Sequence, residues 1–312
     1  MIYTLYIIIA LLIAAYYIII TQLQLNSMRR NVRLCNLYTN QIADALLHED
    51  RHTESIIASS KSERRALTET LFVTMSHCYD INCESISTII KNNNIENFIM
   101  QEMRFASKTQ RALLWLQLAT ITPSARYKQH LRQELRHSDH HLRSCALVAL
   151  LNVAPEESIR TLTNLDYHLQ SYDISRIISL VRRGRLPLAI DPLLQSDSYN
   201  LKRLALAIIR VFNLEISIKN IYSFIEKEEN LELINEAIYT LATLKHPLSS
   251  SSLRAKLLAM SKIQRKNLCR FLSSEGYSLH AMQWLFPQNE IEYAKQLITS
   301  YKRMLVHPNL SL

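Results

Sequence analysis

Five residues of types that bind metals or take part in catalysis crowd into one short stretch, HSDHHLRSC, at residues 137–145. They are His137, Asp139, His140, His141 and Cys145. Imidazole, carboxylate and thiolate groups are common zinc ligands, and the same groups act as general acids, general bases and nucleophiles. The stretch therefore admits three interpretations, which are a metal site, a catalytic cluster and a structural turn.

No recognised catalytic motif accompanies this cluster. The sequence lacks a G-x-S-x-G elbow, a Walker loop, a dinucleotide fingerprint, an H-E-x-x-H pair and a paired C-x-x-C. Only two glycines, Gly184 and Gly276, occur in 312 residues, so most of those loops have no residues to build them. We predict a protein that is not an enzyme and has no cofactor, metal ion or small-molecule substrate. An enzyme with a site in a cleft of the fold is the least favoured alternative.

The five cysteines are an odd number spread over a long chain, which is unlike a disulfide framework and favours a reducing compartment. Cys78 and Cys83, with His77 beside them, form a second zinc candidate. No further ligand pair follows them, so two buried thiols are the preferred interpretation.

Composition predicts the fold class and the sign of the partner's charge. With two glycines, the positive-φ turns of β-hairpins are nearly excluded, so we predict an all-α fold. Lysine and arginine number 36 against 27 aspartates and glutamates, which gives a net charge of +9. This charge favours anionic surfaces such as lipid headgroups, nucleic acid or acidic protein patches.

The segment from Ile2 to Ile20 is almost wholly apolar, and no charged side chain occurs before Arg29. At about 1.5 Å per residue, such a helix would match the roughly 30 Å hydrocarbon core of a bilayer. We therefore expect a transmembrane helix. A cleaved signal peptide is the alternative, but a charged n-region and a small-residue cleavage site are missing.

Basic residues follow the predicted span, and they are Arg29, Arg30 and Arg33. By the positive-inside rule we expect the N-terminus outside and the C-terminal domain in the cytoplasm. Apolar residues at helical spacing continue from Leu34 to Leu46, so we expect an amphipathic stalk. It could lie on an anionic membrane surface, pair with a copy of itself, or dock on the following domain.

Beyond residue 60, helical patterns are broken by short polar turns about thirty residues apart. The breaks fall at 122–126, 154–158, 182–187, 213–217 and 246–252. A period near thirty is typical of an α-solenoid built from helix pairs. Gly184 follows the sequence VRR and suits a left-handed helix C-cap.

Two segments share a more detailed pattern. Asp139 and Arg143 in one correspond to Asp197 and Lys202 in the next, and small residues follow at Ala146 and Ala205, as Ala237 does in a third segment. This pattern resembles the HEAT-repeat family, in the form of a membrane-anchored, bacterial-type member. The resemblance implies antiparallel helix pairs, with the acid in the turn and the base early in the second helix acting as a structural ladder between repeats. In a third segment, Glu229 or Asn230 would fill the turn position.

The predicted architecture is a right-handed α-solenoid of about five or six HEAT-like repeats preceded by one transmembrane helix. Its segments are a transmembrane helix at 1–26, a stalk at 27–60, the solenoid at 61–286, and a C-terminal helix and tail at 287–312. In this register Asp139 is a turn residue and the three histidines surround an exposed inter-helix turn. We therefore predict a structural role for the histidine-rich cluster at residues 137–145 rather than a metal site.

Basic residues form stripes on the predicted helices. The candidate anionic-partner surface comprises Lys262, Arg265, Lys266, Arg270, Arg104, Lys108 and Arg111. The stripes could be a solvated face, a site for an acidic protein or an anionic membrane, or a nucleic-acid site. Aromatic residues do not interleave with these cations along the sequence, and Trp115 and Trp284 lie in apolar runs expected to be core. Nucleic acid is therefore less favoured.

The predicted function is that of a membrane-tethered cytoplasmic scaffold whose solenoid binds a protein partner at the membrane. Stacked helix pairs provide an extended binding surface, and tethering raises the effective concentration of a partner. A nucleic-acid-binding solenoid that uses the basic stripes is the alternative.

Overall fold

A computed structural model describes the backbone of residues 2–47, 55–77 and 83–306, and the side chains of 13–47, 55–77 and 84–301. Every regular element in these residues is a helix, so the predicted all-α class is confirmed. The chain divides into two compact units, Met1–Pro155 and Glu156–Leu312. Cys78 and the side chain of Cys83 lie outside the described residues.

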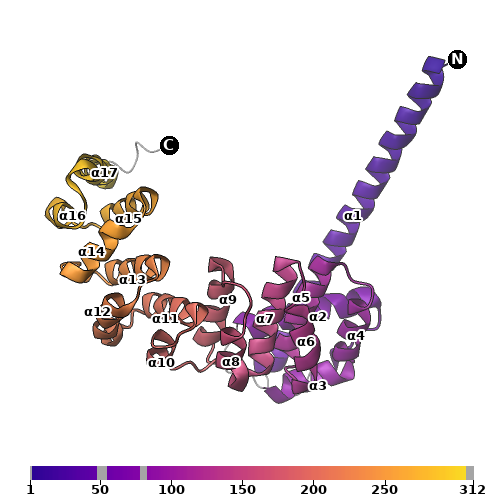
Figure 1. The fold of residues 1–312 in the computed structure, drawn as a ribbon. Helices are drawn as coiled ribbons and strands as arrows, with labels where there is room; N and C mark the ends of the chain where they lie inside the picture. Colours follow the sequence, from indigo (N-terminus) through magenta and orange to yellow (C-terminus); the bar gives the residue numbers. More distant parts are fainter. Residues whose placement is uncertain (1, 48–54, 78–82, 307–312) are drawn as a thin grey trace. The chain divides into compact units, whose positions relative to one another are not determined.

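In the first unit, four of the helices, α1, α2, α5 and α7, pack one on the next in chain order (Figure 1). Helix α1 packs on α2, α2 on α5, and α5 on α7, while α4 and α6 cover α5 and α7. The helices are α1 (Ile2–Leu47), α2 (Lys61–His77), α3 (Cys83–Asn92), α4 (Ile95–Met103), α5 (Lys108–Ile121), α6 (Lys128–Glu134) and α7 (His140–Val153).

Among the described side chains of α1, only those in its C-terminal part belong to the core of the first unit. Tyr38, Ile42 and Ala45 are buried, with Leu34 and Leu46 packed beside them. Of the three alternatives for the predicted stalk, this is the packing expected of a stalk that docks on its domain. Toward its N-terminus the helix extends beyond its neighbours in the unit, as Figure 1 shows.

The predicted transmembrane helix is not found. Described side chains begin after residue 12, and from Thr21 onward α1 carries polar and then charged residues. Within the described part of the chain, no helix combines the length and the apolar character needed to cross a bilayer. This finding contradicts the predicted single-pass membrane localisation, with its external N-terminus and cytoplasmic domain. The side chains of residues 2–12, which belong to the predicted span, lie outside the described part.

Buried asparagines fasten extended segments to helices in both units. The Asn93 side chain is buried, accepts a hydrogen bond from the Ala58 amide at 2.6 Å and donates to the Ile56 carbonyl at 2.8 Å. In the second unit, Asn200 accepts from the Leu169 amide at 2.8 Å and donates to the Tyr167 carbonyl at 2.9 Å. These bonds satisfy backbone groups that a loop would otherwise bury unpaired.

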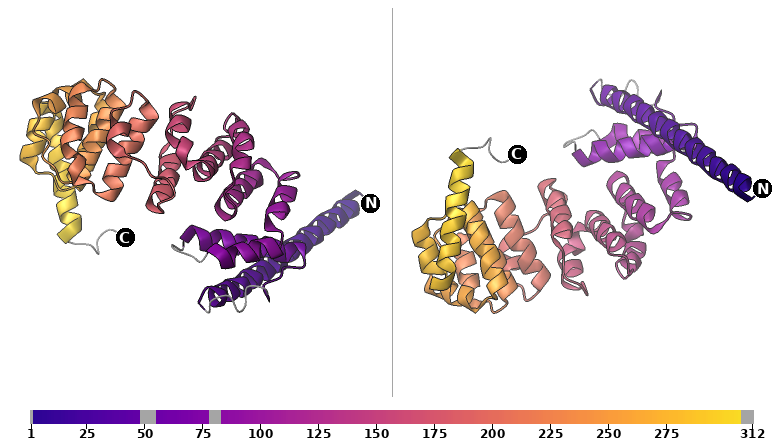
Figure 2. Two further views of the ribbon diagram at one scale, coloured as in Figure 1. Left: turned by 90° about the horizontal axis from the view of Figure 1, so that it is seen from below. Right: turned by 90° about the horizontal axis from the view of Figure 1, so that it is seen from above.

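The second unit has two layers of helices, visible in Figures 1 and 2 from pink to yellow. The long-helix layer is α9 (Ser171–Arg182), α11 (Tyr199–Phe212), α13 (Leu231–Thr243), α15 (Lys262–Ser274) and α17 (Gln288–Val306). The short-helix layer is α10 (Ile190–Leu194), α12 (Ile218–Lys227), α14 (Ser251–Ala259) and α16 (Leu279–Leu285), and α8 (Ser158–Thr163) precedes both layers. Each long helix packs on the next long helix.

Helical spacing of apolar residues explains this packing. On α11 the residues Leu201, Leu204, Ala205 and Ile208 are buried, and they recur at the three- and four-residue intervals of one helix face. Ala237 on α13 is also fully buried, which lets α11 and α13 approach closely. The predicted core position of Trp115 is confirmed by its 4% exposure, whereas Trp284 is only half-buried.

Four long helices end in the same left-handed turn. The residues after α9, α11, α13 and α15 with positive φ are Gly184 (66°), Asn213 (53°), Lys245 (59°) and Gly276 (86°). In each case the next amide donates back to a carbonyl five residues earlier, at 3.0–3.1 Å. This is the hydrogen bond of a Schellman cap, and each such cap ends a long helix where the chain passes to the next short one. The predicted left-handed cap at Gly184 is confirmed.

Each predicted break in the period coincides, within a residue or two, with a junction between α-helices. Side-chain bonds then join elements about thirty residues apart. Thr240 donates to the Leu206 carbonyl at 3.3 Å, the Tyr277 hydroxyl to the His246 carbonyl at 2.6 Å, and the Lys245 ammonium to the Glu275 carbonyl at 2.7 Å. Neighbouring helix pairs are therefore joined by polar bonds as well as by apolar packing.

We predict that Gly184→Ala and Gly276→Ala each lower the free energy of unfolding by about 1 kcal/mol, because a Cβ disfavours positive φ. An added Cβ would meet no atom within 4 Å at either position, so steric clash is not the cause. Urea denaturation measures the change. Gly276→Asn is the matched control and should cost less, since asparagine occupies the equivalent position 213. Alanine variants as stable as the wild type would contradict this account of the turns.

Candidate interaction surface

The histidine-rich stretch forms the turn before α7 and its first residues. The Asp139 carboxylate caps α7 by accepting a hydrogen bond from the Leu142 amide at 2.9 Å, and the Asp139 amide donates to His137 Nδ1 at 3.0 Å. His141 Nε2 lies 3.8 Å from Cys145 Sγ. In the described residues, no three His, Cys, Asp or Glu side chains are grouped as metal ligands would be. The geometry gives Asp139 a local capping role.

The second predicted ladder pair is Asp197 and Lys202. Asp197 is exposed in the turn before α11, whereas Lys202 on α11 forms an ion pair with Glu228 at 2.7 Å. Burial alone would raise the pKa of Glu228, but hydrogen bonds from Lys202 and from the Asn230 amide lower it. Lys202 therefore connects one helix pair to the turn of the next. The turn acid is Glu228, and Asn230 is the N-cap of α13.

The stripe of Arg104, Lys108 and Arg111 is only partly available for binding. Arg104 and Lys108 are exposed. Arg111 Nε lies 3.0 Å from the Glu134 carboxylate, which also accepts from the Trp115 indole at 3.3 Å. Arg111 thus helps to fasten α5 to α6, and its charge is neutralised there.

The four basic residues of α15 also divide into two groups. Arg265 donates to both carboxylate oxygens of Glu290, at 2.8 Å and 3.2 Å, and to the Met260 carbonyl. Its side chain is 16% exposed and that of Glu290 is 5% exposed. Hydrogen bonding to Glu290 raises the pKa of Arg265. A bidentate pair with this burial is a structural connection between α15 and α17.

The other three cations remain exposed, and Lys262, Lys266 and Arg270 follow one another at four-residue intervals on one face of α15. The Lys266 ammonium lies 5.5 Å from the centre of the Tyr293 ring, and Arg270 donates to the Tyr293 hydroxyl at 3.2 Å. We call Lys262, Lys266, Arg270 and Tyr293 together the cationic face. Sequence reasoning missed Tyr293 because it lies on α17, and the packing of α17 on α15 brings it beside the cations.

The three arginines of α1, Arg29, Arg30 and Arg33, are exposed side chains on one helix. Arg30 contributes to lowering the pKa of Glu63, although hydrogen bonds from the Ser60 and Ser59 amides are the larger causes. These arginines lie on the first unit and the cationic face lies on the second.

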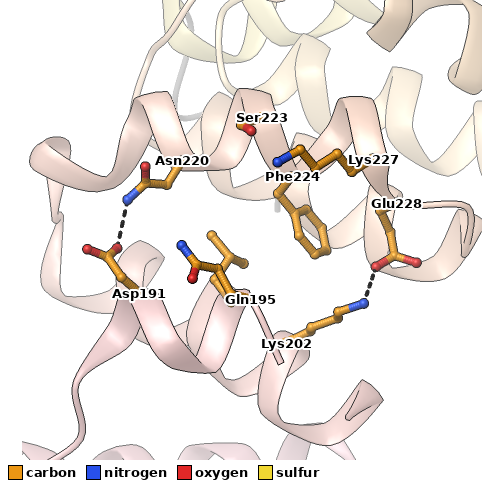
Figure 3. A pocket seen from close by; sticks show the side chains of 9 residues that line it. Asp191, Gln195, Lys202, Asn220, Ser223, Phe224, Lys227 and Glu228 are labelled. Atoms are coloured by element: carbon orange, nitrogen blue, oxygen red, sulfur yellow. Dashed lines mark hydrogen bonds and ion pairs between the residues drawn. The ribbon is translucent and has the colours of Figure 1, made fainter. Parts of the chain in front are cut away.

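A cavity of about 370 Å³ lies between α10 and α12 in the second unit (Figure 3). Leu194 and Phe224 are buried along its wall, and the other side chains that line it are polar or charged. The Asp191 carboxylate accepts a hydrogen bond from Asn220 at 2.7 Å, and the Lys202–Glu228 pair closes another side. The sequence offered no signal for this cavity except the charged residues themselves, which lie far apart along the chain.

We predict that Asp139→Ala lowers the thermal midpoint and that Asp139→Asn largely preserves it, because an amide oxygen can accept the same capping bond. The bond from the Leu142 amide lowers the pKa of Asp139. Its stabilisation should therefore be complete above the ordinary Asp pKa of about 3.9 and disappear as the pH falls through the lower folded pKa. In a plot of the thermal midpoint against pH, Asp139→Asn should reduce the decrease at acid pH. Equal loss in both variants would point to a role that needs the charge.

No protein-family model matches this chain, and neither the curated proteins nor the solved structures contain a match to it. The resemblance to HEAT repeats therefore stays a prediction that these comparisons do not test.

Proposed function

We propose that this protein is an α-solenoid of HEAT-like helix pairs that binds a protein partner, and that the cationic face recognises an acidic segment of that partner. The solenoid arrangement is supported by the left-handed caps about thirty residues apart and by the bonds that join successive pairs. In such an array each pair contacts its neighbours and leaves an extended surface for partners.

The observation that carries the proposal is the separation of structural cations from exposed ones on α15. Arg265 forms an ion pair with Glu290, whereas Lys262, Lys266 and Arg270 are exposed. Four residues of helix rise about 6 Å, so the three cations form a row at that interval. Alternate residues of an extended chain lie about 6.6 Å apart. Acidic residues at every second position of an extended partner segment would therefore match the spacing of the three cations.

The face is also free of acids along its own helix. No aspartate or glutamate occurs between Glu236 and Glu275, so the row meets no competing charge from α14 or α15. The Arg265–Glu290 pair holds α15 against α17 and fixes Tyr293 beside Lys266 and Arg270. Contacts with Tyr293 order Lys266 and Arg270 before a partner binds, which reduces the conformational entropy lost on binding.

A nucleic-acid partner is the second candidate, because Tyr293 lies among the cations. Single-strand binding surfaces use aromatic rings as platforms on which bases stack. Here the ring of Tyr293 faces Lys266 and its hydroxyl accepts from Arg270. The ring is thus engaged by protein groups, which favours an acidic peptide segment over stacked bases.

We predict that the full-length protein binds a fluorescent peptide with the alternating sequence ESESESE and that the K262E/K266E/R270E variant binds it at least about tenfold more weakly. Fluorescence anisotropy at about 50 mM salt measures the affinity, and added salt should weaken it by screening. A peptide with glutamine in place of glutamate should not bind.

The matched control is R160E/R182E/K219E, which makes the same change of net charge at exposed residues of the second unit. This variant should bind the acidic peptide with close to wild-type affinity. Equal weakening in both variants would reduce the effect to net charge and refute the proposed face. Tighter binding of oligo-dT than of the acidic peptide, lost in K262E/K266E/R270E, would replace the acidic segment by nucleic acid.

A further inference from the structure

The cavity between α10 and α12 has the features of a second binding site, separate from the cationic face. Its volume of about 370 Å³ lies within the range of ligand pockets, and it opens between two short helices. Asp191, Leu194 and Gln195 line it from α10 and its C-cap. Asn220, Ser223, Phe224 and Lys227 line it from α12, as Figure 3 shows.

An apolar wall lies at the centre of this site. Leu194 is 3% exposed and Phe224 is 8% exposed, so each presents only a small apolar surface to the cavity. The Lys202 ammonium lies 5.9 Å from the centre of the Phe224 ring and helps to hold it in place. A partner's aliphatic side chain inserted against this wall would leave water and bury both surfaces.

Of the four charged residues that line the cavity, only two form an ion pair with each other. Lys202 and Glu228 are already paired with each other. That leaves Asp191, which is bonded to a neutral amide, and Lys227, which no hydrogen bond or ion pair joins to another described residue. The cavity therefore presents one negative and one positive charge to a ligand.

The residues that carry these two charges are attached toward different ends of α12, Asp191 by a hydrogen bond and Lys227 as part of the helix. Asp191 is bonded to Asn220, and Lys227 is seven residues farther along the helix, or about 10 Å of helix rise. In Figure 3 the Asp191 carboxylate lies beside Asn220, and the Lys227 ammonium reaches over the cavity toward Ser223 and Phe224. A ligand that satisfies both charges and contacts the apolar wall must therefore carry a cation, an anion and an apolar group.

We propose that this cavity binds an extended segment of a partner protein with the pattern basic-x-apolar-x-acidic. In an extended chain, residues two apart point to the same side and lie about 6.6 Å from each other. The apolar side chain would contact Phe224, the basic side chain would pair with Asp191, and the acidic side chain would pair with Lys227. A segment bound in the opposite chain direction, with the pattern acidic-x-apolar-x-basic, would place the same side chains against the same residues.

The test uses the full-length protein and four fluorescent peptides with the cores KSLSE, KSLSK, ESLSE and KSGSE, measured by fluorescence anisotropy. The wild type should bind KSLSE at least about fivefold more tightly than the other three, because only KSLSE supplies both charges and the apolar group. Free leucine at millimolar concentration should not displace it. Displacement by leucine would assign the cavity to a small zwitterion and refute the peptide site.

Charge reversal provides the decisive readout, since it predicts a change of preference and not only a loss. Asp191→Lys leaves two cations at the cavity and should shift the preference to ESLSE. Lys227→Glu leaves two anions and should shift it to KSLSK. Both residues are exposed, so the variants should keep the wild-type circular dichroism spectrum. An unchanged order of preference in both variants would overturn the proposal.

Two controls separate this site from the cationic face. Lys219→Glu changes an exposed charge on α12 outside the cavity and should leave the preference for KSLSE unchanged. The K262E/K266E/R270E variant should also retain KSLSE binding. Loss of KSLSE binding in that triple variant would place the peptide on α15 and contradict this inference, whatever the result with the acidic peptide.

Discussion

The second unit depends on one backbone constraint, which is the left-handed turn that ends its long helices. Without that turn each helix would leave its last carbonyls unsatisfied, and the chain would not reverse toward the short-helix layer. Gly184, Asn213, Lys245 and Gly276 adopt it about thirty residues apart. The layers, the bonds between successive pairs and both proposed binding sites lie on the frame that these four turns produce. Asparagine tolerates this conformation well, but lysine adopts it against its intrinsic preference.

A basic sequence does not translate directly into a basic surface in this protein. Arg111, Lys202 and Arg265 are paired with glutamates, and Lys256 donates to the Glu226 carbonyl at 3.1 Å. These cations connect helices that are adjacent in space and distant in sequence. The cations left for binding are fewer, and two of them, Lys266 and Arg270, lie beside the aromatic ring of Tyr293. Because many cations are used in bonds between helices, the proposed sites contain few charges although the net charge of the chain is large.

Local patterns in the sequence predicted the helical class, the junctions between helices and the capping role of Gly184, because glycine content and helical periodicity act over short distances. Burial of Trp115 followed from its apolar neighbours in the same way. The pairing of Lys202 with Glu228, the position of Tyr293 and the α10–α12 cavity were not predicted, since each needs the register between two helices. The predicted transmembrane helix rested on residues 2–20, and the described residues include no helix that meets the criteria for a span.

Native-state hydrogen exchange on Leu241→Ala tests the central claim, that the second unit is a stack in which each helix pair is stabilised by its neighbours. Leu241 is fully buried on α13, and the cavity left by this substitution should cost roughly 2–5 kcal/mol. The account predicts faster exchange concentrated in α13 and its neighbours α11 and α15, with a smaller effect at α9 and α17. A uniform increase across residues 156–306 would show a single cooperative core and contradict the account.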